Sequence, residues 1–594
     1  AVSRWGPASP FTPYEEASFE HTPAPDHAAF LLPCPLLPSP LSRPPSHTLE
    51  QPLPLRKLDM AATGRKRGWG SSASEPDEEP REATARRLGV WPLDQHNQRL
   101  LDLVRPFSWS DPPPLEQYDL LVLGAGAGGL VSAKQSARRG ASVAFISEHL
   151  AGGDCLNVGC VPSKALLRSA RALREVRRAA DFGVRFPGGT DAKIEIDFAA
   201  VMERMRRLRA DIAPADSHES TAATGAHVFQ GRGRFVSHNK VKVNGTELCF
   251  KKAIIATGGR AAVPPLEGLD RIPYLTNETI FNLTSLPPRM VVLGSGAVGL
   301  EMAQCFAVFG SKVIVISRSS RLLPRSSERA SAALQAALER DGVKFIFHAT
   351  AKEVFLTKQG GADGFPIIHV EYTHGEALTK IESRIECDAL LVAVGRAPNV
   401  EDVGLENAGI AYSNETGITV NSLLTTTNPN VYAVGDCVAG APRLTHMSGE
   451  MAKVAVQNAL FGDSWSLNYH HVPRCIYTEP ELALVGMDEK DVAESGKEVR
   501  FHESDLAHND RVILDGDSAE GGIVSILTEE DGTILGATIF ATRAGEMVNE
   551  VTLAMQGKLS VEALARLVHA YPTVGEGVMQ AALGFVRSRW ARMN

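Results

Sequence analysis

The sequence has few cysteines, no long uncharged apolar run and no marked excess of either charge sign. Eight cysteines in 594 residues are too few for a secreted domain held together by disulfides. No uncharged apolar stretch reaches the ~18 residues that a membrane helix needs. Lys and Arg number 61 against 69 Asp and Glu, a net charge of −8, so neither nucleic acid nor an anionic membrane surface is an expected partner. We expect an intracellular soluble protein, with cytoplasm and organelle both open.

The beginning of the chain also lacks any hydrophobic periodicity. Thirteen prolines fall between Pro7 and Pro54, and neither a helical nor a strand period survives them. We therefore expect residues 1–115 to form a disordered, proline-rich leader and linker. The stretch before Met60 has two interpretations, which the sequence leaves open. One interpretation is a targeting peptide, although acidic residues are unusual in such peptides. The other is that this stretch does not belong to the natural protein.

After Tyr118 short apolar runs alternate with helical stretches. A β–turn–α–β unit over residues 120–146 recurs over residues 290–316, and such alternation predicts parallel sheets with crossover helices. In the last segment strands precede helices, which is typical of an α+β domain. The fold class expected is therefore α/β, with two Rossmann-like dinucleotide-binding domains and a C-terminal α+β domain. The length agrees, because at roughly 150 residues a domain it predicts three or four domains.

Each repeated unit carries a G-x-G-x-x-G loop between its first strand and its helix. The first glycine allows a tight turn, the second lets the backbone approach a pyrophosphate, and the third lets the helix pack on the strand. One such loop is weak evidence in a chain with 52 glycines, but two in the same setting predict two bound dinucleotides. The glycines concerned are Gly124, Gly126 and Gly129 in the first loop and Gly294, Gly296 and Gly299 in the second.

The ends of the second strands indicate which dinucleotides these are. Glu148 lies 19 residues after Gly129, where an acid commonly binds a ribose hydroxyl, although Ser147 competes for the position. The second unit has no acid there and instead carries Ser317 and Arg318. Small polar and cationic groups suit a 2′-phosphate, so we expect NADPH rather than NADH. The alternative is that Arg318 and Arg321 are solvated loop charges.

Two cysteines directly after the first unit are the best candidates for chemistry. Cys155 and Cys160 are five residues apart at the start of a predicted helix, and a helix N-terminus stabilises a thiolate. Their spacing is not that of a zinc site, and no matching Cys/His pair follows, so no metal site is expected. A redox-active disulfide is the hypothesis, and a purely structural disulfide is the alternative.

Several runs of residues resemble the FAD-dependent pyridine nucleotide–disulfide oxidoreductases, which include glutathione reductase, dihydrolipoyl dehydrogenase and mercuric reductase. The resemblance extends from about Trp91 to the C-terminus, and the cysteine run is its most specific part. Besides the two glycine loops, the matching runs are Cys155 to Lys164, Ala256 to Gly259, Val394 to Asn399 and Tyr432 to Asp436.

The resemblance implies roles for individual residues. Cys160 would be the thiolate facing the flavin and Cys155 the interchange thiol, while Lys164 and Glu301 would form an ion pair beside flavin N5. Asp436 would hold the ribityl chain. The further cofactor-binding residues that it implies are Thr257, Gly258 and Gly395.

The resemblance also implies a division of the chain. The FAD-binding domain would comprise residues 116–288 and 415–470, the NAD(P)-binding domain residues 289–414, and the dimerisation domain residues 471–594. A homodimer is therefore expected.

Within the family the chain is most similar to the mercuric reductase-like branch, notably in the runs 91–97, 150–155 and 473–478. Glutathione and lipoamide enzymes carry an acid–base histidine near the C-terminus, oriented by a glutamate. Tyr571 occupies that position here, with Glu576 five residues later, and His569 comes two residues too early to replace the histidine. By resemblance, Tyr571 and Glu576 would act on the partner subunit's thiols. Two departures weaken the match, because the sequence has neither the C-terminal vicinal cysteines nor the N-terminal C-x-x-C domain of mercuric reductases.

The functional hypothesis is an FAD enzyme that passes electrons from NADPH through Cys155 and Cys160 to a small molecule or metal ion such as Hg(II). Two alternatives remain open at this point. One is a disulfide reductase of the dihydrolipoyl dehydrogenase or glutathione reductase type. The other is a non-catalytic flavin-bound interaction subunit.

Overall fold

The structure, a computed structural model, describes residues 81–185, 194–324, 326–358, 365–375, 381–518 and 521–593. The chain divides into two units, Ala1–Asp59 and Met60–Asn594, and everything below concerns the second. The leader predicted for residues 1–59 lies outside the described residues.

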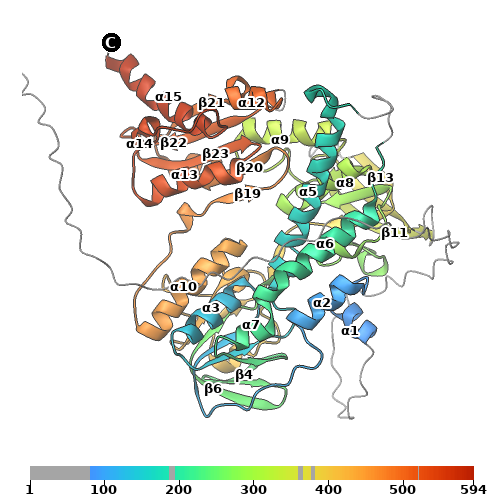
Figure 1. The fold of residues 1–594 in the computed structure, drawn as a ribbon, viewed down its shortest axis with the longest axis vertical. Coiled ribbons are helices and arrows are strands. Elements are labelled where there is room, and N and C mark those ends of the chain that lie inside the picture. Colours follow the sequence, from blue (N-terminus) through green and yellow to red (C-terminus); the bar gives the residue numbers. More distant parts are fainter. Residues whose placement is uncertain are drawn as a thin grey trace, which may run out of the picture. The chain divides into compact units, whose positions relative to one another are not determined.

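The first sheet contains β1, the strand that leads into the first glycine loop, and β4, β6 and helix α3 (Ala127–Arg138) are labelled in this part of Figure 1. Its strand order is β3-β2-β1-β6-β5-β4, and β18 also pairs with β6. The pairs among β1, β2, β3, β6 and β18 are parallel, whereas β4, β5 and the start of β6 form an antiparallel extension. The strands are β1 (Tyr118–Leu123), β2 (Val143–Ile146), β3 (His227–Phe229), β4 (Arg234–Ser237), β5 (Lys240–Val243), β6 (Thr246–Ile255) and β18 (Val431–Ala433).

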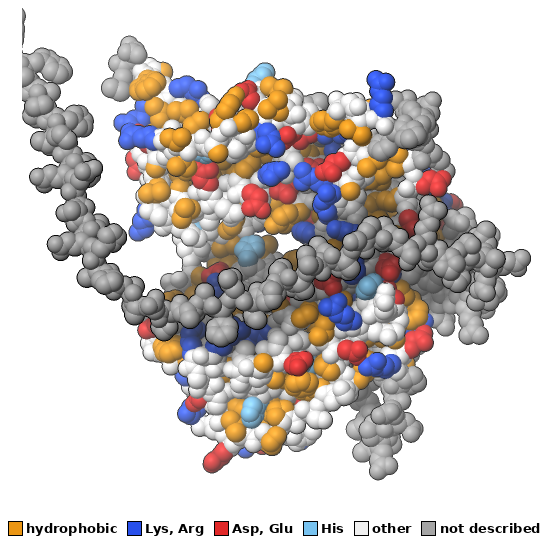
Figure 2. Space-filling view, in the orientation of Figure 1, with side chains coloured by type: hydrophobic (Ala, Val, Ile, Leu, Met, Phe, Trp, Pro, Cys, Tyr) orange, Lys and Arg blue, Asp and Glu red, His pale blue; other side chains and the backbone are white. Residues whose placement is uncertain are grey.

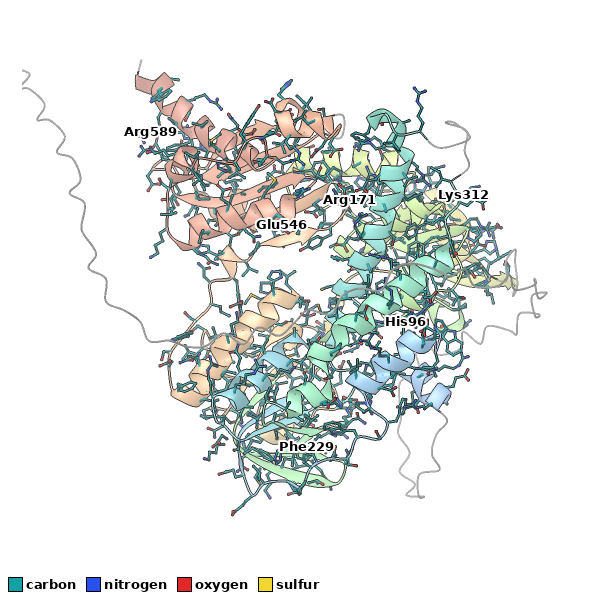
Figure 3. The ribbon with its side chains drawn as sticks, viewed as in Figure 1. His96, Arg171, Phe229, Lys312, Glu546 and Arg589 are labelled. Carbon is teal, nitrogen blue, oxygen red and sulfur yellow. The ribbon has the colours of Figure 1, made fainter. Side chains whose placement is uncertain are left out.

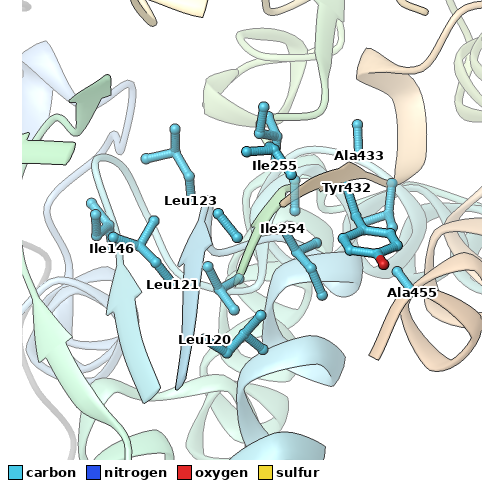
Figure 4. Close-up of a cluster of buried hydrophobic side chains, with 14 of the residues drawn as sticks. Leu120, Leu121, Leu123, Ile146, Ile254, Ile255, Tyr432, Ala433 and Ala455 are labelled. Carbon is cyan, nitrogen blue, oxygen red and sulfur yellow. The ribbon is translucent and has the colours of Figure 1, made fainter. Parts of the chain in front are cut away.

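Continuous apolar runs form this sheet because both of its faces are covered. Leu121, Ile254 and Ala433 are fully buried (Figure 4). Helices α3 (Ala127–Arg138) and α10 (Thr445–Phe461) pack against each other and against these strands. Burial of apolar side chains on both faces holds the glycine loop at the end of β1.

The second sheet repeats the arrangement with the second glycine loop. Its order is β10-β9-β8-β14, all parallel, and an antiparallel sheet β11-β12-β13 adjoins it through a shared hydrophobic cluster. The strands are β8 (Arg289–Leu293), β9 (Lys312–Ile316), β10 (Lys344–Ile346), β11 (Thr350–Lys358), β12 (Ile367–His374), β13 (Ile381–Cys387) and β14 (Ala389–Val392). Its helices are α8 (Ala297–Phe309) and α9 (Glu328–Arg340).

The last segment forms an antiparallel sheet with helices, as its pattern predicts. The order is β19-β20-β23-β22-β21. Its strands are β19 (Arg474–Ile476), β20 (Glu481–Gly486), β21 (Arg500–Asp505), β22 (Ile523–Thr528) and β23 (Ile534–Ala541). Its helices are α11 (Glu489–Ser495), α12 (Asp510–Leu514), α13 (Ala544–Gln556), α14 (Val561–Arg566) and α15 (Glu576–Met593). The predicted fold class, α/β with two Rossmann-like units and a C-terminal α+β segment, is confirmed.

Four further helices and two small sheets lie around the main sheets. The helices are α4 (Gly153–Asn157), α5 (Cys160–Arg177), α6 (Phe198–Ile212) and α7 (His218–Ala222). The small sheets pair β7 (Gly259–Ala261) with β15 (Arg396–Pro398), and β16 (Tyr412–Ser413) with β17 (Gly417–Ile418).

One sequence-based prediction is wrong: the linker is not disordered up to residue 115. Helices α1 (Arg81–Arg87) and α2 (Gln95–Val104) occupy it. Asp94 caps α2 by accepting from the backbone N–H of His96 and Asn97, and Leu100, Leu101 and Val104 are buried. The prolines on either side obscured this short amphipathic helix, whose burial comes from tertiary contacts rather than from propensity.

The surface carries charges of both signs. Acidic and basic side chains are interspersed on the face drawn in Figure 2, without a field of one sign that would attract a polyanion. None of the described helices is both long enough and apolar enough to span a lipid bilayer.

Gly129 offers a test of how the first loop is packed. A Cβ atom on Gly129 would lie 1.8 Å from the carbonyl oxygen of Gly124, whereas one on Gly449 of α10 would meet nothing within 4 Å. We expect Gly129→Ala to lower the thermal unfolding midpoint by roughly 4–10 °C. Gly449→Ala is the matched control and should leave the midpoint unchanged or slightly higher, because alanine favours a helix. Equal midpoints in circular dichroism melts would contradict this packing.

Candidate functional site

The helix that carries the first cysteine lies directly on the first glycine loop. Gly153 begins α4 with φ +57°, and a Cβ there would lie 2.7 Å from Cα of Gly126. The neighbouring Gly152 donates its N–H to the carbonyl of Ala125 at 2.8 Å. Only glycine permits this approach and this backbone conformation, so the cysteines are fixed beside the nucleotide loop.

The two cysteines are brought together at the junction of two helices. Cys155 lies in α4 and Cys160 begins α5. Both are free, half-buried thiols in the structure, and Cys160 Sγ is 3.2 Å from the hydroxyl oxygen of Thr445. Thr445 is the first residue of α10, so a third helix contributes a polar contact to this thiol.

The environment separates the acidities of the thiols. A hydrogen bond with Cys155 lowers the pKa of Cys160 to about 6, helped by Thr445 and Lys164, while burial opposes this. The same hydrogen bond and burial raise the pKa of Cys155. Cys160 is therefore the thiol that ionises first.

Lys164 and Glu301 form the ion pair that the family resemblance implies. Lys164 lies one turn into α5, and its Nζ is 2.9 Å from Oε2 of Glu301, which is only 4% exposed on α8. The other carboxylate oxygen of Glu301 accepts from the backbone N–H of Tyr477 at 3.0 Å. Lys164 Nζ also lies 4.3 Å from the centroid of the Tyr477 ring, a favourable cation–π distance. The pair thus joins the two nucleotide units and β19.

Asp436 takes part in a second charged group. Arg396 donates to Asp436 at 2.8 Å and to Asp154 at 2.5 Å, and also to the carbonyl of Gly259 at 2.9 Å. Asp154 immediately precedes Cys155, so this arginine ties the thiol helix to the turn that carries Asp436. Burial raises the pKa of Asp154, and the charge of Arg396 opposes that shift.

The two runs that contain Thr257, Gly258 and Gly395 come together in the structure. Thr257 Oγ1 donates to the carbonyl of Asn399 at 2.7 Å, and the N–H of Asn399 donates to the carbonyl of Gly258 at 2.9 Å. Gly258 has φ +70° and Gly395 φ +142°. The runs that contain them pair through β7 and β15, forming one wall at the end of the first sheet.

The end of β2 leaves Glu148 exposed and turns Ser147 inward. Ser147 is fully buried, with its hydroxyl 3.1 Å from Nε2 of His218. Glu148 lies 3.3 Å from Arg232 in an exposed ion pair. Of the two candidates for a ribose contact, only Glu148 presents its side chain outward.

The second glycine loop is held by serines, with an arginine free to face outward. Ser295 and Ser317 hydroxyl oxygens are 2.9 Å apart. Arg321 donates to the carbonyls of Ser326 and Pro324, so it is occupied within its own loop. Arg318 is exposed, so within the part of this loop that the structure describes it is placed to meet a ligand at the end of β9.

Tyr571 and Glu576 lie in the last segment, and the described chain alone does not bring them to the thiols. Tyr571 is 70% exposed, and its hydroxyl donates to Oδ2 of Asp510 at 2.5 Å. This hydrogen bond raises the pKa of Tyr571, and the charges of Asp510 and Glu576 add to the effect. His569 is engaged elsewhere, with Nε2 3.1 Å from the carboxylate of Glu550.

Sequence reasoning missed Thr445, Arg396 and Asp154 as site residues. Arg396 and Asp154 lie within matching runs and could have been singled out as charges next to glycine or cysteine. Thr445 had no sequence signal, because it is 285 residues from Cys160. Among the described residues no three or more His, Cys, Asp or Glu side chains gather as a resident metal site would require.

Two dinucleotide folds, a pair of thiols on helices beside the first glycine loop and a final α+β segment together define a nucleotide-dependent thiol redox protein. The family models agree. Residues 118–458 match the pyridine nucleotide-disulphide oxidoreductase model, and residues 472–582 match the dimerisation domain of the same family. The chain belongs to the pyridine nucleotide-disulphide oxidoreductase family.

Relatives with two different names match at similar identity. The chain is 31% identical to a mercuric reductase of Lysinibacillus sphaericus, covering 80% of this chain and 84% of that one. It is 32% identical to a dihydrolipoyl dehydrogenase of Geobacillus stearothermophilus, covering 78% and 96%. Among solved structures, the Cu(II) complex of the HOCl-induced flavoprotein disulfide reductase RclA from Escherichia coli matches with a TM-score of 0.67 and 25% identity, over 79% of this chain and 99% of that one.

Members of this family depend on FAD and use NAD(P)H, and the residues present fit both groups. Gly126 at the start of α3 and Gly296 at the start of α8 leave open space for a nucleotide. A Cβ on Gly126 would meet nothing closer than 3.9 Å, and one on Gly296 nothing within 4 Å. Backbone N–H groups at a helix N-terminus bind a pyrophosphate. The dimerisation domain supports a homodimer.

The thiol pKa can be tested without turnover. Because the hydrogen bond from Cys155 is the main cause of the low pKa of Cys160, removing the donor should raise that pKa. In the reduced protein we expect Cys160 to be alkylated by iodoacetamide with a midpoint near pH 6. Cys155→Ser keeps a hydrogen-bond donor, so the alkylation midpoint of Cys160 should stay close to that of the unmodified protein. Cys155→Ala has no donor and should shift this midpoint up by about one pH unit. Mass spectrometry of the Cys160 peptide gives the rates, and equal midpoints in the two variants would contradict this cause.

Proposed function

We propose that the protein is a homodimeric flavoenzyme that passes two electrons from NADPH through Cys155 and Cys160 to a soft, thiophilic metal ion such as Hg(II). When bound, FAD supplies the two-electron relay between the nicotinamide and the thiols. Supporting this proposal are the mercuric reductase relatives and a neighbour in complex with Cu(II). A thiolate pair suits ions of this kind.

The thiols divide the work in this proposal. Cys160, with the lower pKa, faces the flavin as a thiolate, and Lys164 beside it favours that charge. Cys155 stays protonated more readily and receives the acceptor. The buried Glu301 holds Lys164 in place, and Asp436, Thr257, Gly258 and Gly395 line the flavin site.

The proposed acceptor depends on one observation, the hydrogen bond from Tyr571 to Asp510. A phenol has one proton, and here the carboxylate already accepts it. The hydroxyl oxygen therefore presents lone pairs, which suit a cation or an S–H donor. Its pKa, raised above about 10, also makes it a poor proton shuttle near neutrality.

A second candidate is reduction of a disulfide substrate, which the pair of His569 and Glu550 favours. The His569 imidazole lies 3.1 Å from the Glu550 carboxylate, and His569 comes two residues before Tyr571. An imidazole oriented by a carboxylate is a good acid–base unit. The dihydrolipoyl dehydrogenase relatives agree with this candidate.

A non-catalytic interaction subunit is the third possibility in the proposal. Such a protein has no use for two thiols of unequal acidity beside an ion pair between Lys164 and the buried Glu301. Bleaching of the purified yellow protein by NADPH separates it from the two enzymes.

We also propose domain boundaries consistent with the three main sheets. The FAD-binding part comprises residues 116–288 and 415–470, which hold all the strands of the first sheet. The NAD(P)-binding part comprises residues 289–414, and the dimerisation part residues 471–594.

The acceptor is tested by NADPH oxidation with Hg(II), Cu(II), oxidised glutathione and lipoamide. We expect the metal ions to be reduced faster than the disulfides. The gap of about 3.5 pKa units between phenol and imidazole corresponds to about 4.8 kcal/mol for proton transfer at neutral pH. Tyr571→Phe should slow the metal reaction, because the oxygen is lost, and Tyr571→His should raise disulfide turnover.

Two outcomes would decide against a metal acceptor. Efficient turnover of glutathione or lipoamide by the unmodified protein, without a response to either metal ion, would favour the second candidate. Loss of that turnover in His569→Gln, but not in Tyr571→Phe, would assign the acid–base role to His569.

Cofactor choice gives a separate test. With Arg318 exposed at the end of β9 and no acid there, NADPH should exceed NADH in kcat/KM by roughly ten- to a hundredfold, the value of one charge-assisted hydrogen bond. Arg318→Glu should remove most of this preference. Arg271→Glu is the control, since Arg271 is exposed outside the second glycine loop. Equal use of both cofactors by the unmodified protein would show that Arg318 is only a surface charge.

A further inference from the structure

A segment outside both nucleotide units packs behind the thiol helix. Residues 85–104, called here the N-terminal support, share a hydrophobic cluster with Leu150, Ala151 and Leu156. Leu156 lies between the two cysteines and is 1% exposed. The cluster therefore fixes the inner side of α4, and the members contributed by the support are Ala85, Leu88, Val90, Leu100, Leu101 and Val104.

A buried arginine joins this support to the span between the cysteines. Arg209 of α6 is 1% exposed. One of its nitrogens, Nη2, donates to Oδ1 of Asn97 at 2.6 Å, and the other, Nη1, donates to the backbone carbonyl of Asn157 at 2.6 Å. Asn157 stands between Cys155 and Cys160, so α2, α6 and the thiol span meet at one guanidinium.

The support is itself held in register against α6. Asp94 caps α2 and accepts from Arg206 at 2.5 Å, and Asn97 is fully buried with its amide donating to the carbonyl of Pro92 at 2.7 Å. Helices α2 and α6 lie side by side (Figure 1). His96 of α2, labelled in Figure 3, lies 3.6 Å from Glu203 of α6 in this interface.

The other end of the thiol helix is attached to the same support. Ala151, just before α4, donates its N–H to the carbonyl of Val104 at 3.0 Å. The start of α4 is thus bonded to the end of α2, and its last residue, Asn157, is bonded through Arg209 to the beginning of α2. The support therefore spans the helix that carries Cys155.

Stability alone is a weak reason for such an arginine. Burial lowers the pKa of Arg209 to about 10, so it remains charged at neutral pH. A buried charge costs free energy that its bonds roughly offset, and Arg209 Nε has no hydrogen-bond partner among the described residues. The clearest effect of the arginine is the position of the two groups it joins.

We infer that Asn97 and Arg209 are positioning residues for the redox thiols, fixing the backbone between Cys155 and Cys160 so that both sulfurs keep their places when the disulfide opens. The inference rests on the proposed function, in which these thiols carry the electrons. It predicts that steps requiring the thiols depend on Asn97, while electron transfer that bypasses them does not.

The test compares two reactions of the full-length holoenzyme. In the first, NADPH reduces two equivalents of ferricyanide, an acceptor that takes electrons directly from the flavin. In the second, NADPH is oxidised in a reaction that depends on Hg(II) and requires the thiols. We expect Asn97→Ala to lower the thiol-dependent rate about tenfold or more, the value of one hydrogen bond to a charged group. The ferricyanide rate should stay within about twofold. The alkylation midpoint of Cys160 should also move upward, because its hydrogen bond with Cys155 is loosened.

Two further variants complete the design. Asn97→Asp keeps an oxygen acceptor for Arg209 but loses the N–H that the carbonyl of Pro92 accepts, so it should restore the thiol-dependent rate and the midpoint in part. Arg99→Ala breaks an exposed ion pair with Asp211, 2.7 Å long, between the same two helices, and should change neither. If Asn97→Ala does not fold, Arg209→Lys, which keeps the charge but loses the fork, takes its place.

The outcomes separate the inference from the proposed function. A parallel fall of both rates, or no change in either rate or in the midpoint, would overturn the positioning role. Absence of any thiol-dependent reaction in the unmodified protein would overturn the proposed function instead. The alkylation midpoints of Cys160 in Asn97→Ala and in the unmodified protein would then still decide the positioning role, a shift supporting it and equality overturning it.

Discussion

The close approach of Gly153 to Gly126 is the contact on which the arrangement of the site depends. With 2.7 Å between a hypothetical Cβ on Gly153 and Cα of Gly126, any side chain would force the thiol helix away from the nucleotide loop. Because α4 and α5 follow without a break longer than two residues, fixing Gly153 also fixes Cys160 and Lys164. The Lys164–Glu301 pair then carries this alignment to the second nucleotide unit.

Helix α5 extends the same alignment to the antiparallel sheet of the last segment. Arg174, near its end, donates to the carbonyl of Glu479 at 2.8 Å, and Gln304 of α8 donates to that carbonyl at 2.7 Å and accepts from the N–H of Glu479 at 2.8 Å. Burial raises the pKa of Glu479 to about 7, against the charges of Arg171 and Arg174. A turn between β19 and β20 is therefore held by both nucleotide units. This explains why Tyr477 can contact Lys164 and Glu301 together.

Local patterns predicted the parts of the site that are local in sequence. The glycine loops, the spacing of Cys155 and Cys160 and the strand ends at Glu148 and Ser317 each depend on a few consecutive residues, so the sequence contains them. The contacts between distant segments were not predictable. Arg209 looked like one of many charges on an arginine-rich helix, and nothing within α6 indicates that it is buried against Asn97. Thr445 reaches Cys160 only because α10 packs on α3, a consequence of the whole sheet. Helix α2 was missed because its burial, too, depends on partners far along the chain.

The charges around Tyr571 also affect which acceptor would bind beside it. Asp510 accepts the phenolic proton, and the charges of Asp510 and Glu576 both act on the tyrosine. Two carboxylates beside a phenol with its lone pairs outward make a locally negative surface. Such a surface attracts a metal cation and repels a disulfide that carries carboxylates, as oxidised glutathione does. Under the proposed function, in which the partner subunit would present Tyr571 to Cys155, the same residues would both withhold the acid–base proton and select the charge of the acceptor, and both effects would favour a thiophilic cation over an anionic disulfide.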